Sequence, residues 1–164
     1  MTVQSYLTSW LAMREATLGE KFAEAHAGWW LVWEPGSWKP NPGPAAATLR
    51  PATAVSPTAG DALCFQLGEA TPGGRTLRLG RDLTNDLVID DGTVSRHHLT
   101  LRSVSQGWEL EAVRDLSVDD QPVSAGRRLK VHAGARVTVG GVQLTLHGNA
   151  DLRARLKAIV AALK

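Results

Sequence analysis

The sequence predicts an all-β sandwich with helical extensions at its N- and C-terminal ends. From Leu63 onward, short apolar segments alternate with glycine-containing turns, and this region has no long helical stretch in its interior. On either side of it, apolar residues recur at the spacing of a helix. With 164 residues, of which 43% are hydrophobic, the chain is long enough for one domain with its own core and two extensions.

Residues 1–34 are expected to form a helical and tryptophan-rich segment. Within residues 6–27, four apolar side chains recur at helical spacing: Leu7, Leu11, Leu18 and Phe22. Thr17 opens a sequence with the spacing of a capping box, so two helices with a break near Thr17 are one interpretation. Residues 28–33 are too short for a helix and rich in strand formers. Their tryptophans either pack onto the sandwich, as an added strand or cover, or present an aromatic surface to a partner.

Residues 35–60 mark a domain boundary, because the composition shifts there to Pro, Ala, Thr, Ser and Gly. Such a segment does not support a packed core and predicts an extended or mobile linker. The sandwich domain is then expected over residues 61–148, and an amphipathic helix over residues 149–164. The strands are predicted at residues 63–67, 76–79, 87–89, 98–104, 108–113, 128–131, 136–139 and 142–146.

Charge and cysteine content exclude several classes of protein. The net charge is +2, and four cations against one aspartate in residues 151–164 leave the rest of the chain at −1. A basic tail on a near-neutral body does not predict a nucleic-acid partner. Cys64, the single cysteine, allows no disulfide within the chain and favours a reducing compartment. No signal peptide and no apolar run of about 20 residues is present, so we expect a cytoplasmic protein without membrane insertion.

Two arginines and a serine lie on successive loops of the predicted sandwich. Arg81 follows a glycine at a strand end, and Ser95 and Arg96 come about fourteen residues later, after a second polar turn. A guanidinium group offers a planar fork of donors that matches a phosphate, and a serine hydroxyl adds a neutral donor. These loops therefore predict an anion site. The alternative is that Arg81 forms a surface ion pair with Asp82 or Asp86, and that Ser95 only closes a turn.

These residues also resemble the signature of the forkhead-associated (FHA) domain, a β-sandwich that reads phosphothreonine peptides. The resemblance rests on Gly80-Arg81, on the segment 85–89 and on Ser95-Arg96-x-His98, and it covers roughly residues 61–148. Later segments match the later strands of that family in order: Trp108-Glu109-Leu110, Asp115-Leu116, Gln121-Pro122-Val123 and residues 134–140.

The resemblance implies a role for each matching residue. Arg81, Ser95, Arg96 and Asn85 are the expected phosphopeptide-binding residues, with Ser95 on the phosphate and Arg96 on the phosphate or its rim. Gly80 and His98 are expected to support the site, the histidine through hydrogen bonds of its ring that steady the loops. The implied partner is a phosphothreonine-containing protein in a Ser/Thr protein kinase pathway.

The sequence departs from the family where the asparagine of an Asn-Gly-Thr motif would grip the bound peptide. One alignment places Val118-Asp119-Asp120 on a later turn of the family, with the intervening loop deleted. A gapless alignment instead places Asp119 at the position of the asparagine. A carboxylate does not donate the hydrogen bond that an amide donates, and it repels a phosphate. A degenerate FHA fold that acts as a phosphate-independent interaction or assembly module is therefore the alternative.

Neither catalysis nor a metal centre is expected. His97 and His98 are neighbours on a strand and point to opposite faces, and no further cysteine or histidine ligands stand at useful spacing. A Ser95–His98 nucleophile–base pair would lack an orienting acid and a nucleophile elbow. We therefore expect a signalling adaptor with no catalytic residues, no metal and no cofactor.

Overall fold

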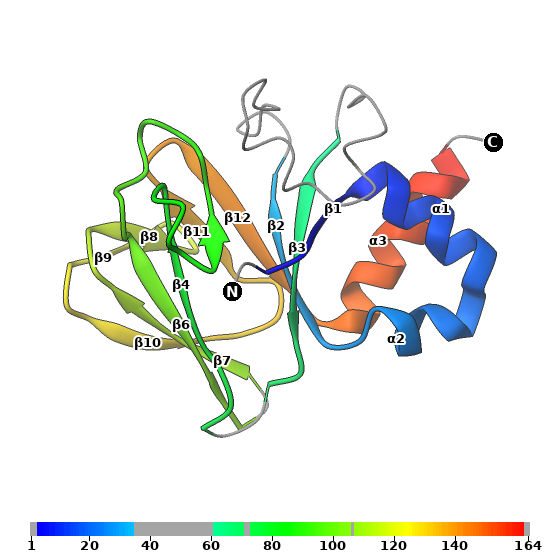
Figure 1. The fold of residues 1–164 in the computed structure, drawn as a ribbon, viewed down its shortest axis with the longest axis horizontal. Helices are drawn as coiled ribbons and strands as arrows, with labels where there is room; N and C mark the ends of the chain where they lie inside the picture. Colours follow the sequence, from blue (N-terminus) through cyan, green and yellow to red (C-terminus); the bar gives the residue numbers. More distant parts are fainter. Residues whose placement is uncertain (1–2, 35–60, 71–72, 106, 163–164) are drawn as a thin grey trace.

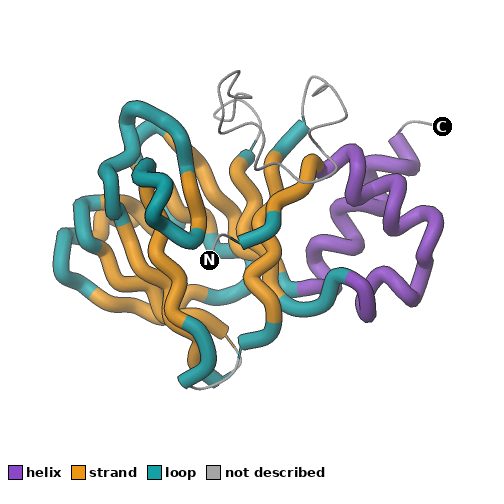
Figure 2. The backbone as a smooth tube through the Cα atoms, viewed as in Figure 1, coloured by secondary structure: helices purple, strands orange, loops and turns teal. Residues whose placement is uncertain are grey.

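The computed structural model describes residues 3–34, 61–70, 73–105 and 107–162. Two β-sheets pack face to face, and helices cover one end of the larger sheet (Figure 1). The tube in Figure 2 shows the same separation, with strands in two layers and helices gathered at one side. The predicted all-β sandwich with helical ends is confirmed. The predicted linker, residues 35–60, lies outside the described residues.

The larger sheet has seven strands, and the smaller sheet has five. The order in the larger sheet is β1 (Ser5–Leu7), β3 (Leu63–Gly68), β2 (Trp29–Trp33), β12 (Val142–His147), β11 (Arg136–Val139), β8 (Leu116–Val118) and β9 (Gln121–Val123). The order in the smaller sheet is β10 (Arg128–Val131), β7 (Gly107–Ala112), β6 (Leu99–Val104), β4 (Thr76–Gly80) and β5 (Leu87–Val88). β4 and β5 pair in parallel, and the other pairs of these strands are antiparallel.

The tryptophan-rich segment is a central strand of the sandwich. β2 pairs with β3 on one side and with β12 on the other. Leu31 and Trp33 face the core between the two sheets, whereas Trp30 and Val32 face a second core beneath the helices. Successive side chains of a strand point to opposite faces, so a strand that is covered on both faces is apolar throughout. Of the two interpretations, the added strand is therefore the one that the structure has.

Two stretches differ from the sequence-based expectation. Ser5–Leu7, placed partly in the N-terminal helix, is the strand β1, since it pairs with β3. β8 and β9 are missing from the strands predicted by alternation, although the FHA resemblance matched Asp115-Leu116 and Gln121-Pro122-Val123 to later strands of that family. They form a hairpin whose turn is Asp119-Asp120, with φ angles of 51° and 66°. Positive φ at both central positions suits the twist of a two-residue hairpin turn, and aspartate is among the residues that tolerate it. Strands of three residues are too short for periodicity to reveal.

The N-terminal helices pack against the C-terminal one. Helix α1 (Thr8–Leu18) ends at Gly19, whose φ is 56°, and is followed by η1 (Gly19–Lys21) and α2 (Phe22–Ala25). Asp61 takes the place of an N-cap for α1, because its carboxylate accepts hydrogen bonds from Thr8 Oγ1 at 2.6 Å and from the Ser9 amide at 3.0 Å. None of the described helices is long and apolar enough to cross a membrane.

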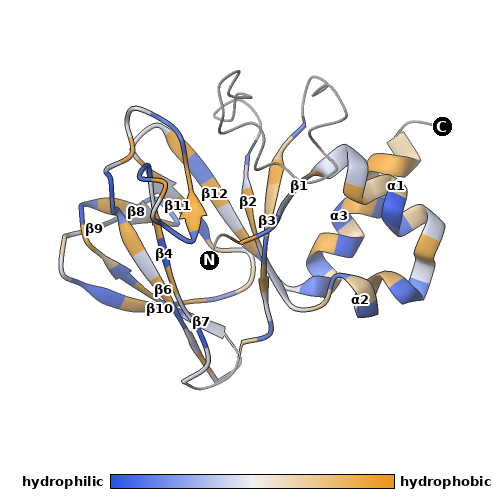
Figure 3. Cartoon of the chain, viewed as in Figure 1, coloured by the Kyte–Doolittle hydropathy of each residue, from blue (hydrophilic) through white to orange (hydrophobic). Residues whose placement is uncertain are grey.

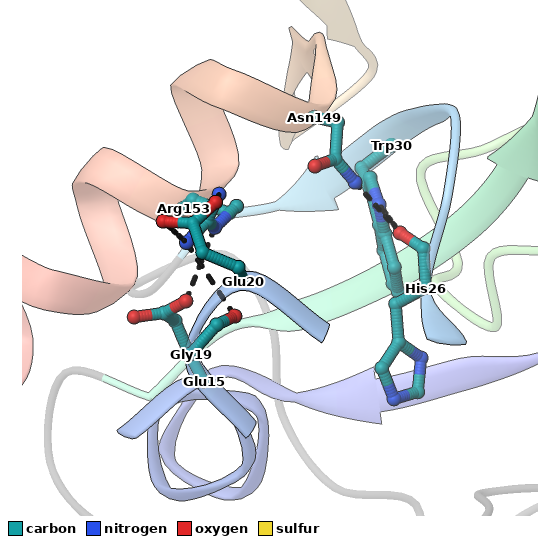
Figure 4. Close-up of polar contacts among 7 residues, drawn as sticks. All are labelled: Glu15, Gly19, Glu20, His26, Trp30, Asn149 and Arg153. Carbon is teal, nitrogen blue, oxygen red and sulfur yellow. Dashed lines mark hydrogen bonds and ion pairs between the residues drawn. The ribbon is translucent and has the colours of Figure 1, made fainter. Parts of the chain in front are cut away.

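Helix α3 (Asn149–Ala162) is attached to the N-terminal helices by polar contacts (Figure 4). Arg153 donates from Nε to the buried carboxylate of Glu15 at 3.1 Å and from Nη1 to exposed Glu20 at 3.3 Å. The Asn149 amide donates to the backbone carbonyl of His26 at 2.7 Å. In Figure 3, hydrophobic residues (orange) occur on the helices as well as along the strands. The helical ends thus form one unit on the outer face of β2 and β3.

Candidate functional site

Three loops meet at one end of the smaller sheet and carry the residues that the sequence singled out. Strand β4 ends at Gly80, β6 begins at Leu99, and β7 ends at Ala112. Leu99 pairs with both Leu79 of β4 and Ala112 of β7, so these three strand ends lie side by side. The loops at this edge are residues 81–86, 89–98 and 113–115.

The first two loops are held together by their backbones. The Arg81 amide donates to the carbonyl of Ser95 at 2.9 Å, and the Asp82 amide donates to the carbonyl of Arg96 at 3.2 Å. A Cβ atom added at Gly80 would lie 2.1 Å from the carbonyl oxygen of Arg96. Glycine is therefore required at position 80, because any side chain there would force the two arginine-bearing loops apart. Gly80 thus allows the close approach of these two loops.

The buried side chain of Asn85 connects the same two loops. Its amide nitrogen donates to the carbonyls of Asp82 at 2.8 Å and of Arg96 at 2.6 Å, and the residue is 3% exposed. The structure therefore does not bring Asn85 to the surface with the other expected phosphopeptide-binding residues. A short amide side chain in a turn is used here to satisfy backbone carbonyls, which is its common use in loops.

His98 connects the second loop to the third. Its Nδ1 accepts a hydrogen bond from the Ser95 amide at 3.1 Å, so the proton of the neutral ring is on Nε2. Nε2 in turn donates to the carbonyl oxygen of Asp115 at 3.0 Å. Both nitrogens are thus used by backbone groups, and neither is left to accept a proton from the Ser95 hydroxyl. The ring is buried, and its two hydrogen bonds join the second and third loops.

The surface formed by these loops is an open depression of about 630 Å³. Its lining residues are Arg81, Ser95, Arg96, His97, Val113 and Arg114. Three of the four expected phosphopeptide-binding residues, Arg81, Ser95 and Arg96, thus share one surface. Arg81 donates from Nε to the carbonyl of Val94 at 3.1 Å, which orients its guanidinium group. Sequence reasoning missed Arg114, although its position two residues after the end of β7 and beside Asp115-Leu116 places it at this edge.

The carboxylates near these loops are bound to backbone amides. Asp82 accepts hydrogen bonds from the Thr84 amide and hydroxyl, both at 3.1 Å, and Asp86 accepts one from the Arg78 amide at 2.9 Å. The backbone and side-chain hydrogen bonds from Thr84, and to a lesser extent the charges of Arg96 and Arg78, lower the pKa of Asp82. The expected alternative, an ion pair of Arg81 with Asp82 or Asp86, is not formed among the described residues.

Asp119 and Asp120 lie on the β8–β9 hairpin and do not line the depression. Asp119 accepts a hydrogen bond from the Arg136 amide at 2.9 Å and lies 3.6 Å from Nε2 of His132, and Asp120 lies 3.8 Å from Nη1 of Arg136. The pair thus forms the turn of the β8–β9 hairpin, outside the lining of the depression. No carboxylate occurs among the described residues that line the depression.

His97 also lines the depression, and it belongs to no metal-binding cluster among the described residues. Burial, and then the nearby charge of Arg78, lower the pKa of His97, which favours the neutral form of its ring. Its Nε2 lies 3.0 Å from the Thr100 hydroxyl. Across the described ranges, no group of three His, Cys, Asp or Glu residues is arranged to hold a metal ion. The charge of the depression therefore comes from its arginines.

A protein family described as "Inner membrane component of T3SS, cytoplasmic domain" matches residues 69–150, which is half of the chain. The chain belongs to this family. Its FHA-like fold, expected from the sequence, is confirmed by this match together with the two-sheet architecture. No curated protein sequence matches the chain.

Solved structures of similar fold include FHA domains from several organisms. The FHA domain of CT664 from Chlamydia trachomatis is 14% identical to this chain, with a TM-score of 0.48. The alignment covers 73% of this chain and 96% of the CT664 domain. The second FHA domain of the ABC transporter Rv1747 from Mycobacterium tuberculosis is 34% identical over 48% of this chain and 70% of that chain, with a TM-score of 0.38. The N-terminal FHA domain of Saccharomyces cerevisiae Rad53p, solved with a phosphothreonine peptide, is 15% identical over 49% and 73%, with a TM-score of 0.43.

Proposed function

We propose that this chain is a phosphothreonine-dependent protein–protein interaction module, a signalling adaptor without catalytic activity. The observation that supports this function is that Arg81, Ser95 and Arg96 line one open depression and that no carboxylate is among its described lining residues. In this proposal Arg81 and Ser95 bind the phosphate and Arg96 binds the phosphate or its rim. Gly80, Asn85 and His98 hold the loops in place.

The strength of such contacts is sufficient for a regulatory interaction. A phosphothreonine carries about −1.5 to −2 charges at pH 7. A hydrogen bond to a charged group contributes ~1.5–3 kcal/mol, and a micromolar complex requires ~8 kcal/mol. Contacts from Arg81, Ser95 and Arg96 would supply about half of this or more. The missing peptide-gripping asparagine would weaken binding by roughly tenfold to a hundredfold without abolishing it.

The proposed partner is a phosphothreonine-containing protein, and the enzyme that modifies it is a Ser/Thr protein kinase. The family description names the cytoplasmic domain of an inner membrane component. We propose a cytoplasmic location for this chain on the same basis. The partner must therefore be accessible to a kinase in that compartment.

A phosphate-independent assembly module is the second candidate function. Two observations favour it: the family description names a component of a larger apparatus, and the sequence has no Asn-Gly-Thr motif. In this function the sandwich would bind a partner through shape and apolar contacts, and phosphorylation of the partner would not change its affinity.

Binding to a randomised phosphothreonine peptide library, beside its unphosphorylated counterpart, tests the two functions. We expect selective retention of the phosphorylated peptides. The variant Arg81→Ala should lower the affinity for a retained peptide by about tenfold or more. Arg102→Ala is the matched control: it removes the same charge from the opposite end of the sheet, where Arg102 pairs with Thr76 at the start of β4. Equal retention of both libraries by the unmodified protein would favour the assembly module.

A further inference from the structure

Arg114 is a third guanidinium group in the depression, beside Arg81 and Arg96. Its backbone amide donates to the carbonyl of His98 at 3.1 Å, so the position of the residue is set by the main chain. Its side chain is exposed and forms no ion pair within the described residues. The ion pairs of described arginines involve other positions: Arg102, Arg128, Arg136, Arg153 and Arg155.

The charge of the depression exceeds that of one phosphate. Three guanidinium groups line it, and the neutral ring of His97 adds no charge. A phosphothreonine brings at most about two negative charges at pH 7. One positive charge is therefore left without an opposite charge when a singly phosphorylated, otherwise neutral peptide is bound.

Among the described residues, none of these three arginines forms an ion pair with a carboxylate. Beside Arg114, Asp115 accepts a hydrogen bond from the Ala125 amide at 2.9 Å. In the adjacent loop, Asp91 accepts hydrogen bonds from the Thr93 amide at 2.8 Å and from its hydroxyl. Both carboxylates thus support their own loops, as do Asp82 and Asp86. An anionic group on the partner can therefore pair with Arg114 without displacing an ion pair between described residues.

We propose that Arg114 makes the site selective for a phosphothreonine accompanied by a second anionic group on the same partner. This inference rests on the proposed phosphothreonine function and adds a partner class to it. The second anion is an acidic side chain or a second phosphorylated residue, since a guanidinium group binds carboxylates and phosphates alike. Arg81 and Ser95 bind the phosphate, and Arg114 binds the second anionic group of the partner.

Four peptide pools test this selectivity: unphosphorylated, phosphorylated with neutral flanks, phosphorylated with acidic flanks, and doubly phosphorylated. Affinities are measured by fluorescence anisotropy with the full chain. We expect the acidic or the doubly phosphorylated pool to bind roughly three- to thirtyfold more tightly than the neutral phosphorylated pool. The pool with the larger gain identifies the source of the second anion.

The variant Arg114→Ala should remove this gain while it keeps the preference for phosphorylated over unphosphorylated peptides. Arg114→Lys, which keeps the charge, should retain most of the gain, and Arg102→Ala should leave it unchanged. An undiminished gain in Arg114→Ala, or equal binding of the three phosphorylated pools by the unmodified protein, would overturn the role of Arg114. Loss of all discrimination between phosphorylated and unphosphorylated pools in the unmodified protein would instead refute the phosphothreonine function and this inference with it.

Discussion

The buried ring of His98 donates a hydrogen bond of 3.0 Å from Nε2 to the carbonyl oxygen of Asp115, while its Nδ1 accepts one from the Ser95 amide at 3.1 Å. One ring therefore connects the loop that carries Ser95 and Arg96 to the loop that carries Arg114. Both bonds are made with backbone groups, which leaves the side chains of the depression available to a ligand. The surface depends on His98 although His98 does not line it.

Replacement of this ring should cost both stability and binding. His98→Ala leaves the Ser95 amide and the Asp115 carbonyl without partners, so we expect the free energy of unfolding to fall by about 2–3 kcal/mol. Urea unfolding measures the change, and peptide affinity should fall with it. His132→Ala, at an exposed histidine, serves as control. Equal losses in the two variants would contradict the connecting role of His98.

Gly80→Ala should separate the loops that carry Arg81 and Arg96. The added methyl group would lie 2.1 Å from the carbonyl oxygen of Arg96, so the backbone must move, and we expect a loss of about 1–3 kcal/mol in unfolding free energy. Gly92→Ala is a close control, because its Cβ meets nothing within 4 Å. A Gly80→Ala variant as stable as Gly92→Ala would show that the loops do not depend on their close approach.

Glu15→Ala should loosen the attachment of helix α3. The Glu15 carboxylate is buried and lies 3.1 Å from Nε of Arg153, so its loss leaves a largely buried guanidinium group short of a partner. We expect the melting temperature to fall by roughly 5–10 °C. Glu20→Ala removes the exposed partner of the same arginine and should lower the melting temperature by about 2 °C or less. Similar shifts for both variants would argue against the buried pair as the main contact.

Stability should rise as the pH increases toward and through about 6.5, the ordinary pKa of histidine in the unfolded chain. Burial, and then the charge of Arg14, lower the pKa of His26 below its ordinary value. The folded ring therefore stays neutral where the unfolded chain takes up a proton, so the unfolded state is favoured as the pH falls below about 6.5.

The variant His26→Phe tests this dependence, because phenylalanine fits the aromatic surroundings of Tyr6, Phe22 and Trp30 and does not titrate. Urea unfolding at several pH values should give a shallower rise than in the unmodified protein. Some rise should remain, because burial also lowers the pKa of His147. An unchanged slope in His26→Phe would exclude His26 as a contributor, and exposed His132→Gln is the control.

Much of the fold follows from local patterns in the chain. β10 and β11 lie at the predicted residues, and most other predicted strands differ by a residue or two at their ends. Alternation of apolar and polar residues is a local property and can be observed without knowledge of the partner strand. Arg81, Ser95 and Arg96 could be grouped in the same way, because each lies on a loop between predicted strands.

Only the tertiary structure decided which strands are neighbours and which side chains share a surface. β2 lies between β3 and β12, and no local pattern in residues 29–33 specifies these partners. Asn85 was expected among the phosphopeptide-binding residues but is buried beneath the loops, whereas Arg114, which sequence reasoning did not single out, lines the depression. Pairing and side-chain direction depend on contacts between residues far apart in the chain, and those contacts exist only once the two sheets have packed together.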